Sequence, residues 1–472
     1  MHGCTITSAG YWSHARVLAD SFLASNPHAR LWVLSVDGSR EAMPGGERVQ
    51  MLAPGDVGVD DRELQRRATM YTPQTVAQSM KPNLLASVLD RAPGPVIFFD
   101  ADACVYDDLD CVAELAETHS LVLSPQTLDP NPLARPEDSA EEIALRTGIY
   151  NSGFVAVGPG AEPFLDWWAG HTGRRCVWDW SCQRMLDQPW LVLASTLFDH
   201  HVLKDRGCNV AGWNLHARDV HWVGDRPTID GGPLRHFHFA CGYDPERPEL
   251  LARDQKYWPT LAGRPGVARL SREYARRLLD NGYVQERMRP VQGVAMLSGA
   301  PIEPWMRVVY RSALINAEQN GGVEPPNPFA HGEEHFSAWI RDRAVPTVDA
   351  LMKGGASAWP EAGAPDLQAF ELVAAMARVR ELAPRIGELE AIRDDAIAWA
   401  QREADRSRAA AAERDALARQ LEDARAVMTS VWNSPSWRLT RPLRGAKASV
   451  MGLRSRRRHP DVGSVSETRQ AT

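Results

Sequence analysis

The feature that most constrains the fold is the alternation of short apolar runs with amphipathic segments along the first part of the chain. Strands are expected at "GCTITS" and "RLWVLSVDG", on either side of a helix at "SHARVLADSFLAS" that has Ala15, Leu18 and Phe22 at helical spacing. Further elements follow the same rule, with strands at "GPVIFFD", "SLVLSP" and "YNSGFVAV" and helices at "VAQSMKPNLLASVLDRA", interrupted near Pro82, and "AEPFLDWWAGH". This order predicts an α/β fold, with a Rossmann-like, mostly parallel sheet covered by helices on both faces.

The composition is that of an ordinary soluble protein. The chain has 472 residues, 44% of them hydrophobic and 24% charged, so it can bury at least one sizeable core. No apolar run reaches the length of a membrane span, and the first residues lack the pattern of a signal peptide. The net charge of -7 gives no nucleic-acid footprint. We therefore expect a cytoplasmic protein with no nucleic-acid partner.

The cysteines are scattered along the chain and contain no CxxC pair. Their pattern supports neither a disulfide framework nor a zinc knuckle. We expect reduced thiols, most of them buried, at the seven positions Cys4, Cys104, Cys111, Cys176, Cys182, Cys208 and Cys241.

The acidic stretch "FFDADACVYDDLD" follows directly on an expected strand. Ligands of open α/β sheets bind where strands end, and this is where Asp100 and Asp102 lie. Two carboxylates one residue apart can offer oxygen ligands to Mg²⁺ or Mn²⁺. A solvated loop is the alternative, because so short a motif is weak by itself. Asp107, Asp108 and Asp110 precede the helical "CVAELAET", so we expect them to cap that helix.

Several segments resemble bacterial nucleotide-sugar glycosyltransferases of the GT-A fold, a relationship that extends to the glycogenin and lipopolysaccharide galactosyltransferase group. In chain order they are "TITSAGYWSHARVLADSF", "WVLSVDG", "MKPNLL", "IFFDADACVYDDL", "YNSGFVAVG", "LDQPWL", "NVAGWNLHAR" and "RHFHFACGYDP". The resemblance implies a GT-A catalytic domain that transfers a sugar from a nucleotide diphosphate sugar, with a UDP-sugar as the expected donor. The implied acceptor is a glycan or a lipid-linked sugar of bacterial surface polysaccharide synthesis.

The resemblance also implies a metal and a cation for the donor's diphosphate. Mn²⁺ or Mg²⁺ would act as a Lewis acid on the leaving diphosphate, held by Asp100, Asp102 and a histidine. His238 is our candidate for that histidine, with His236 as the alternative; a half-buried strand with both histidines on one face is the plain structural interpretation. Lys81 is the candidate cation for the diphosphate, and the alternative is a solvated lysine on a helix.

The remaining implied residues face the sugar or the nucleoside. Sugar-facing catalytic candidates are Asn151, Asp187 and Gln188, and Gly153 would let the backbone approach the donor. Each also has a structural interpretation, a strand bulge for the Asn-Ser-Gly run and a turn at Pro189 for the Asp-Gln pair. The expected nucleoside contacts are Thr5, Thr7, Tyr11 and Asp37. Trp213 and Asn214 are the candidates to line the acceptor side, with a core position as the alternative for Trp213.

Two other function classes compete with this interpretation. A Rossmann dehydrogenase is disfavoured, because no GxGxxG follows the first strand. A non-catalytic assembly protein with a degenerate transferase domain is the alternative of a different class. The sequence does not choose between retention and inversion of the anomeric configuration.

The chain beyond the catalytic domain changes in character. We expect a GT-A domain over 1–260, a helical appendage over 261–345, a linker over 346–384, a coiled-coil helix over 385–431 and a basic tail over 432–472. The coil predicts a homo-oligomer, with a single charged helix as the alternative. The tail suits contact with the anionic inner face of the plasma membrane, and a disordered solubilising tail is the alternative.

Overall fold

The structure is a computed structural model of the whole chain. It describes residues 1–130, 140–179, 184–240, 242–252, 261–289, 296, 298–340 and 342, together with a few residues between 420 and 435. The chain divides into two compact units, Met1–Ala377 and Arg378–Thr472. The linker lies outside the described residues, and so do most of the coil and the tail. The expectations for these segments therefore stay predictions.

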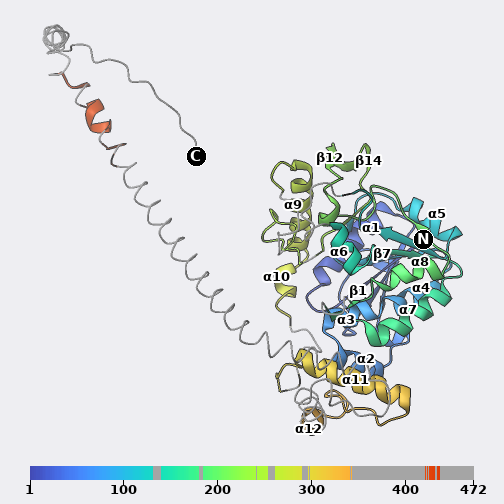
Figure 1. Cartoon of the computed structure of the whole chain (residues 1–472). Coiled ribbons are helices and arrows are strands. Elements are labelled where there is room, and N and C mark those ends of the chain that lie inside the picture. Colours follow the sequence, from blue (N-terminus) through green and yellow to red (C-terminus); the bar gives the residue numbers. More distant parts are fainter. Residues whose placement is uncertain are drawn as a thin grey trace, which may run out of the picture. The chain divides into compact units, whose positions relative to one another are not determined.

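A seven-stranded sheet organises the first unit (Figure 1). Strand β1 pairs in parallel with β2 and β4, β2 with β3, and β10 with β6, whereas β7 runs antiparallel to both of its neighbours, β4 and β6. The predicted α/β fold with a mostly parallel sheet is thus confirmed. In sheet order the strands are β10 (His201–Val202), β6 (Leu121–Pro125), β7 (Tyr150–Val157), β4 (Val96–Asp100), β1 (His2–Thr7), β2 (Arg30–Ser35) and β3 (Val49–Leu52).

Helices cover both faces of this sheet because its central strands are apolar on both sides. In β4, Phe98 packs into a core cluster with α4, α7 and α8, while Ile97 and Phe99 pack into a second cluster with α1 and α5. The continuous apolar run "VIFF" is what a doubly covered strand requires. The helices are α1 (Trp12–Ser25), α4 (Lys81–Arg91), α5 (Asp110–Thr118), α7 (Glu162–Arg175) and α8 (Trp190–Leu197).

A small second sheet lies at the end of β4 and has the strand order β11-β15-β5. Strand β5 follows β4 after a two-residue turn, and β15 pairs antiparallel with it. A distant part of the chain is thereby brought beside the acidic turn. The strands outside the main sheet are β5 (Ala103–Val105), β8 (Trp178–Asp179), β9 (Arg184–Met185), β11 (Val210–Ala211), β12 (Val220–Val223), β13 (Arg226–Ile229), β14 (Gly232–Pro233) and β15 (His236–His238).

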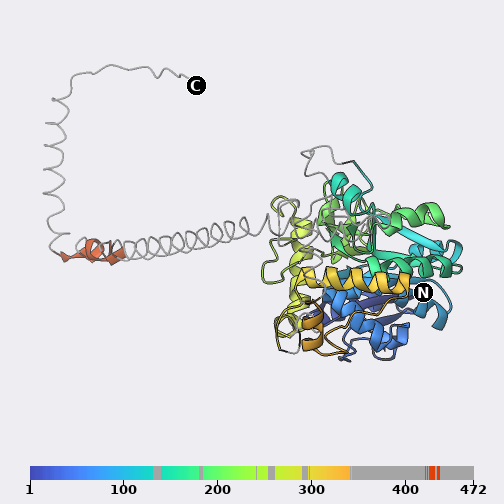
Figure 2. The ribbon, with the colours of Figure 1, turned by 60° about the horizontal axis from the view of Figure 1, so that its bottom comes forward.

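The helices after residue 260 belong to the first compact unit. Helix α9 packs on α1 and β12. Helix α11 packs on α2 (Figures 1 and 2). The Arg307 side chain fastens α11 to α2 by donating to the backbone carbonyl oxygens of Ala68, Thr69 and Tyr71. These helices and the remaining ones are α2 (Asp61–Met70), α3 (Pro73–Ser79), α6 (Ala140–Thr147), α9 (Pro265–Asp280), α10 (Tyr283–Glu286), α11 (Pro304–Asn320) and α12 (Glu333–Trp339).

Two local expectations need refinement. The helix expected to be interrupted near Pro82 is two helices, α3 and α4, which meet at Met80, and Pro82 lies in the first turn of α4, where its missing N–H costs nothing. The N-cap of α5 is Leu109 and not an aspartate. Asp110 does lie in the first turn, but Asp108 instead accepts the Asp110 N–H and pairs with Arg235.

No helix within the described part of the chain combines the length and the apolarity that a membrane span requires.

Candidate active site

Asp100, Asp102 and His238 come together where β4 ends. Asp100 is the last residue of β4, Asp102 lies in the turn to β5, and His238 lies opposite Ala103 of β5. His238 Nε2 is 3.0 Å from Asp102 Oδ1 and 3.8 Å from Asp100 Oδ2, and one ligand atom from each residue lies within 4.8 Å of the others. Two carboxylates and an imidazole at this spacing fit a divalent cation such as Mn²⁺ or Mg²⁺.

The carboxylates and the imidazole of this cluster stabilise one another's charged forms. Burial lowers the pKa of His238, but the Asp102 and Asp100 carboxylates outweigh burial and raise it. Burial likewise raises the pKa of Asp102, and His238 outweighs it, so the net shift is downward. The side chains of Asp100 and Asp102 remain 31% and 21% exposed, so solvent and a cation can reach them. Asp100 is paired with Lys81 and Asp102 with His238, so both carboxylates have protein partners as well as solvent, and their role as metal ligands stays a prediction.

Gly153 in β7 makes room for two of these side chains. A Cβ atom at this position would lie 2.7 Å from His238 Cε1 and 2.9 Å from Asp100 Cγ, closer than real Cβ contacts come. The sequence predicted a glycine that allows close approach to a ligand. In the structure, the groups that it lets approach are protein side chains, and any contact of its backbone with the donor stays a prediction.

Lys81 lies behind the cluster and is buried. Its ammonium is 3.0 Å from Asp100 Oδ1 and 3.0 Å from Asp187 Oδ2, and it donates to the backbone and hydroxyl oxygens of Ser152 at 3.2 Å. Burial lowers the pKa of Lys81, but the two carboxylates outweigh burial and raise it. The alternative of a solvated helix lysine is therefore wrong. The geometry shows Lys81 holding Asp100 in place; direct contact with a diphosphate stays a prediction.

The Asp187-Gln188 pair braces the same region. The Asp187 side chain is 1% exposed and faces Lys81. Gln188 Oε1 accepts the backbone N–H of Ser152 at 3.2 Å, and Gln188 Nε2 donates to the backbone oxygen of Thr147 at 2.9 Å. The pair thus fixes the start of β7, from which Gly153 faces the carboxylates. Its predicted role toward a sugar is not tested by these contacts.

Asn151 orients the imidazole of His238. Asn151 Nδ2 is 3.1 Å from His238 Nδ1 and donates to Asn209 Oδ1 at 2.7 Å, while Asn151 Oδ1 accepts the Gly153 N–H at 2.8 Å. Asn209 in turn donates to the backbone oxygen of Pro125 at 2.9 Å. Sequence reasoning missed Asn209, because nothing local marks a residue that acts through a second asparagine.

His236 and the two candidate acceptor residues, Trp213 and Asn214, have different surroundings. The His236 ring stacks on Phe154, its nitrogens find no hydrogen-bond partner among the described residues, and burial holds its pKa well below the usual value. His236 is therefore a core residue, and His238 is the histidine beside the carboxylates. The Trp213 ring meets His238 edge-on at 5.4 Å, next to the cluster, whereas Asn214 is buried and donates to the backbone oxygens of Asn209 and Gln126.

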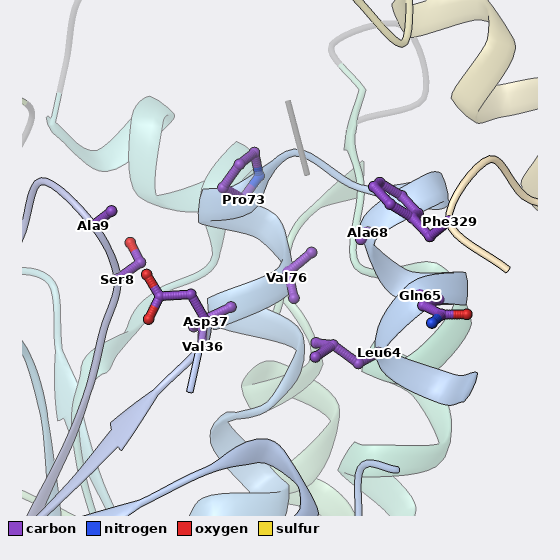
Figure 3. Close-up of a pocket in the computed structure, with 10 residues that line it drawn as sticks. All are labelled: Ser8, Ala9, Val36, Asp37, Leu64, Gln65, Ala68, Pro73, Val76 and Phe329. Carbon is purple, nitrogen blue, oxygen red and sulfur yellow. The ribbon is translucent and has the colours of Figure 1, made fainter. Parts of the chain in front are cut away.

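A pocket of about 180 Å³ lies where β1 and β2 end (Figure 3). Asp37 lines it, held by hydrogen bonds from the hydroxyls of Ser35 and Ser39 at 2.7 and 2.6 Å. Burial raises the pKa of Asp37, but these hydrogen bonds outweigh burial and lower it. The full lining is Ser8, Ala9, Val36, Asp37, Leu64, Gln65, Ala68, Pro73, Val76 and Phe329.

Of the expected nucleoside contacts, the structure brings only Asp37 to this pocket. Thr5 and Thr7 are buried within β1, and Tyr11 precedes α1 and packs on His14. Phe329 also lines the pocket, and sequence reasoning did not identify it. It comes from the segment between α11 and α12, where Asn327 Oδ1 accepts the backbone N–H of Phe329 at 3.1 Å and fixes the turn.

No family model and no curated protein matches the chain. Solved structures with similar folds include the galactosyltransferase LgtC in complex with donor and acceptor sugar analogs, which is 18% identical, covers 58% of this chain and 95% of its own, and has a TM-score of 0.34. The glycosyltransferase GlyE of Streptococcus pneumoniae TIGR4 is 13% identical over 62% of this chain and 66% of its own, with a TM-score of 0.34. Mouse xyloside xylosyltransferase 1 is 13% identical, covers 44% of this chain and 87% of its own, and has a TM-score of 0.28. By their descriptions all three are glycosyltransferases.

Proposed function

We propose that this protein is a metal-dependent glycosyltransferase. It takes a sugar from a nucleotide diphosphate sugar, with a UDP-sugar as the donor, and transfers it to a glycan or lipid-linked acceptor in bacterial surface polysaccharide synthesis. The observation that carries the proposal is the cluster of Asp100, Asp102 and His238 at the end of β4, an edge of the sheet where α/β proteins bind ligands.

The cluster would hold Mn²⁺ or Mg²⁺, which supplies Lewis-acid stabilisation of a departing diphosphate. Asp100 and Asp102 provide the charge and His238 the third donor atom. Lys81 and Asn151 act as positioning residues, because Lys81 contacts Asp100 and Asn151 contacts the imidazole of His238. A site preorganised in this way spends little binding energy on arranging its ligands.

The nucleoside of the donor fits the pocket beside β1 and β2. A charged carboxylate such as Asp37 accepts hydrogen bonds from ring N–H groups or ribose hydroxyls, and the aromatic face of Phe329 suits stacking on a base. Asn151, Asp187 and Gln188 remain the candidates for the sugar side, with Gly153 beside them. Thr5, Thr7 and Tyr11 are weaker candidates, because they do not line the pocket that Asp37 lines.

A screen of nucleotide sugars tests this function. We expect at least one donor to be hydrolysed or transferred in the presence of Mn²⁺, with activity lost on chelation and reduced by a factor of 100 or more in Asp102→Asn. The magnitude follows from losing electrostatic stabilisation worth about 3 kcal/mol or more. Asp108→Asn, which removes an acidic side chain outside the cluster, is the matched control. Binding of a donor without turnover would favour the non-catalytic assembly protein instead.

The C-terminal expectations belong to the same proposal. We infer that the coil over 385–431 makes a homo-oligomer, and that the basic tail over 432–472 places a cytoplasmic enzyme at the inner face of the plasma membrane, where lipid-linked acceptors lie. Light scattering with and without the coil tests the first inference. Co-sedimentation with anionic liposomes, with and without the tail, tests the second, and equal pelleting of the two chains would contradict it.

A further inference from the structure

A second group of potential metal ligands lies outside the candidate active site and shares no residue with it. Cys111 is in the first turn of α5, and Asp205 and Cys208 lie in the turn before β11. One ligand atom from each of the three lies within 4.8 Å of the others. The two cysteines are far apart in the sequence, which is why their spacing predicted no metal site.

The spacing of the group suits a small tetrahedral ion. Zinc binds sulfur at about 2.3 Å and carboxylate oxygen at about 2.0–2.2 Å, so sulfur and oxygen ligands of one tetrahedral zinc lie about 3.5 Å apart. Cys111 Sγ is 4.0 Å from Asp205 Oδ2. A contraction of about half an ångström would bring these two atoms to the spacing of zinc ligands, and the other ligand atoms lie within 4.8 Å of them. Cys208 is buried, whereas Cys111 and Asp205 are partly exposed.

The surroundings orient the carboxylate and balance the charge. Gly207 donates its backbone N–H to Asp205 Oδ1 at 2.7 Å, which leaves Oδ2 facing Cys111. Arg235 Nε lies 3.5 Å from that same oxygen and is buried without a hydrogen-bond partner among the described residues. Two thiolates and one carboxylate around a divalent zinc leave one negative charge, and the guanidinium of Arg235, which also pairs with Asp108, lies beside it.

We propose that Cys111, Asp205 and Cys208 bind a zinc ion, with water as the fourth ligand. The ion would tie the first turn of α5 to the turn that leads into Asn209. Asn209 supports Asn151, which contacts His238. Thiolate ligands favour zinc over the Mg²⁺ and Mn²⁺ that suit the oxygen-rich cluster at the end of β4, so the two sites select different ions.

Cobalt substitution tests the proposal with a signal that the candidate active site cannot give. Thiolate ligation of Co²⁺ produces a charge-transfer absorption band in the near ultraviolet, whereas carboxylate and imidazole ligands produce none. The full chain would be reduced, stripped with a chelator and titrated with Co²⁺, and the band would then be displaced with Zn²⁺. We expect the band to saturate at one ion per chain, to be lost in Cys111→Ser, and to be lost or weakened at least tenfold in Asp205→Asn.

Two control variants distinguish this site from the candidate active site and from the other thiols. Asp102→Asn, in the candidate active site, should keep the band, and so should Cys176→Ser, which removes a buried thiol outside the group. Since Cys111 is half-buried, its serine variant should fold, which the circular dichroism spectrum checks. Absence of the band in the wild-type chain, its persistence in Cys111→Ser, or a disulfide between Cys111 and Cys208 in protein purified without reductant would each overturn the proposal.

Discussion

Replacing Lys81 by methionine should strongly destabilise the protein. Methionine keeps most of the volume of the side chain but removes the ammonium, which leaves the Asp187 side chain, 1% exposed, without its cation. Breaking a buried ion pair from one side costs about 3–5 kcal/mol, because the remaining charge is buried and uncompensated. Asp100 contributes less to this cost, since its side chain is 31% exposed. We therefore expect the free energy of unfolding to fall by about 3–5 kcal/mol.

Urea unfolding at neutral pH measures this loss, and a double-mutant cycle assigns it. Asp187→Asn alone should cost less than Lys81→Met, because Lys81 keeps Asp100 as its partner. The double variant should recover part of the loss, so that the two single effects are non-additive by about 2 kcal/mol or more. Lys204→Met, at an exposed lysine, is the matched control and should change stability by no more than about 0.5 kcal/mol. A Lys81→Met effect as small as that of Lys204→Met, or strict additivity with Asp187→Asn, would refute the reasoning.

Three further predictions follow from the packing around the site. Gly153→Ala should fold but bind Mn²⁺ at least tenfold more weakly by calorimetry, because the new methyl group displaces Asp100 and His238; unchanged affinity would contradict the close approach. Phe329→Ala should weaken nucleotide binding by about 1–3 kcal/mol, the contribution of one base–aromatic stack, whereas Phe336→Leu, a core change outside the pocket, should affect stability rather than affinity. Hydrogen bonds from Arg66 lower the pKa of Glu324 from its ordinary 4.5 to about 2, so this ion pair stabilises the fold above about pH 4.5 and is lost as the pH falls toward 2. The difference in unfolding free energy between wild type and Glu324→Gln should accordingly be full at pH 6 and vanish near pH 2, and a pH-independent difference would exclude this linkage.

Local patterns in the sequence predicted five of the seven strands of the main sheet and missed the short edge strands β3 and β10. The apolar run before Asp100 had to be a strand buried on both faces, and its position after a helix made a parallel pairing with β1 the natural arrangement. The placement of Asp100 and Asp102 at a strand end followed from that. The pairing of His238 with them did not follow from any local pattern, because it depends on β15 joining β5 across a long separation in the sequence.

Features that depend on long-range packing could not be predicted. Lys81 was predicted to contact a diphosphate, and its burial between Asp100 and Asp187 depends on segments that are distant in the sequence. Phe329 carries no motif, and it reaches the pocket because Arg307 and Glu324 fasten its segment to α2. The proximity of Cys111 and Cys208 likewise arises from the fold and not from their spacing.

The most direct test of the central claim is the binding of Mn²⁺ with and without a nucleoside diphosphate, followed by electron paramagnetic resonance. If Asp100, Asp102 and His238 hold the cation that meets the donor's diphosphate, one Mn²⁺ per chain should bind, and UDP should tighten its affinity at least tenfold. By linkage, Mn²⁺ should tighten UDP binding by the same factor. Both effects should disappear in Asp102→Asn. An Mn²⁺ affinity that is unchanged by Asp102→Asn, or that does not respond to any nucleoside diphosphate, would contradict the account.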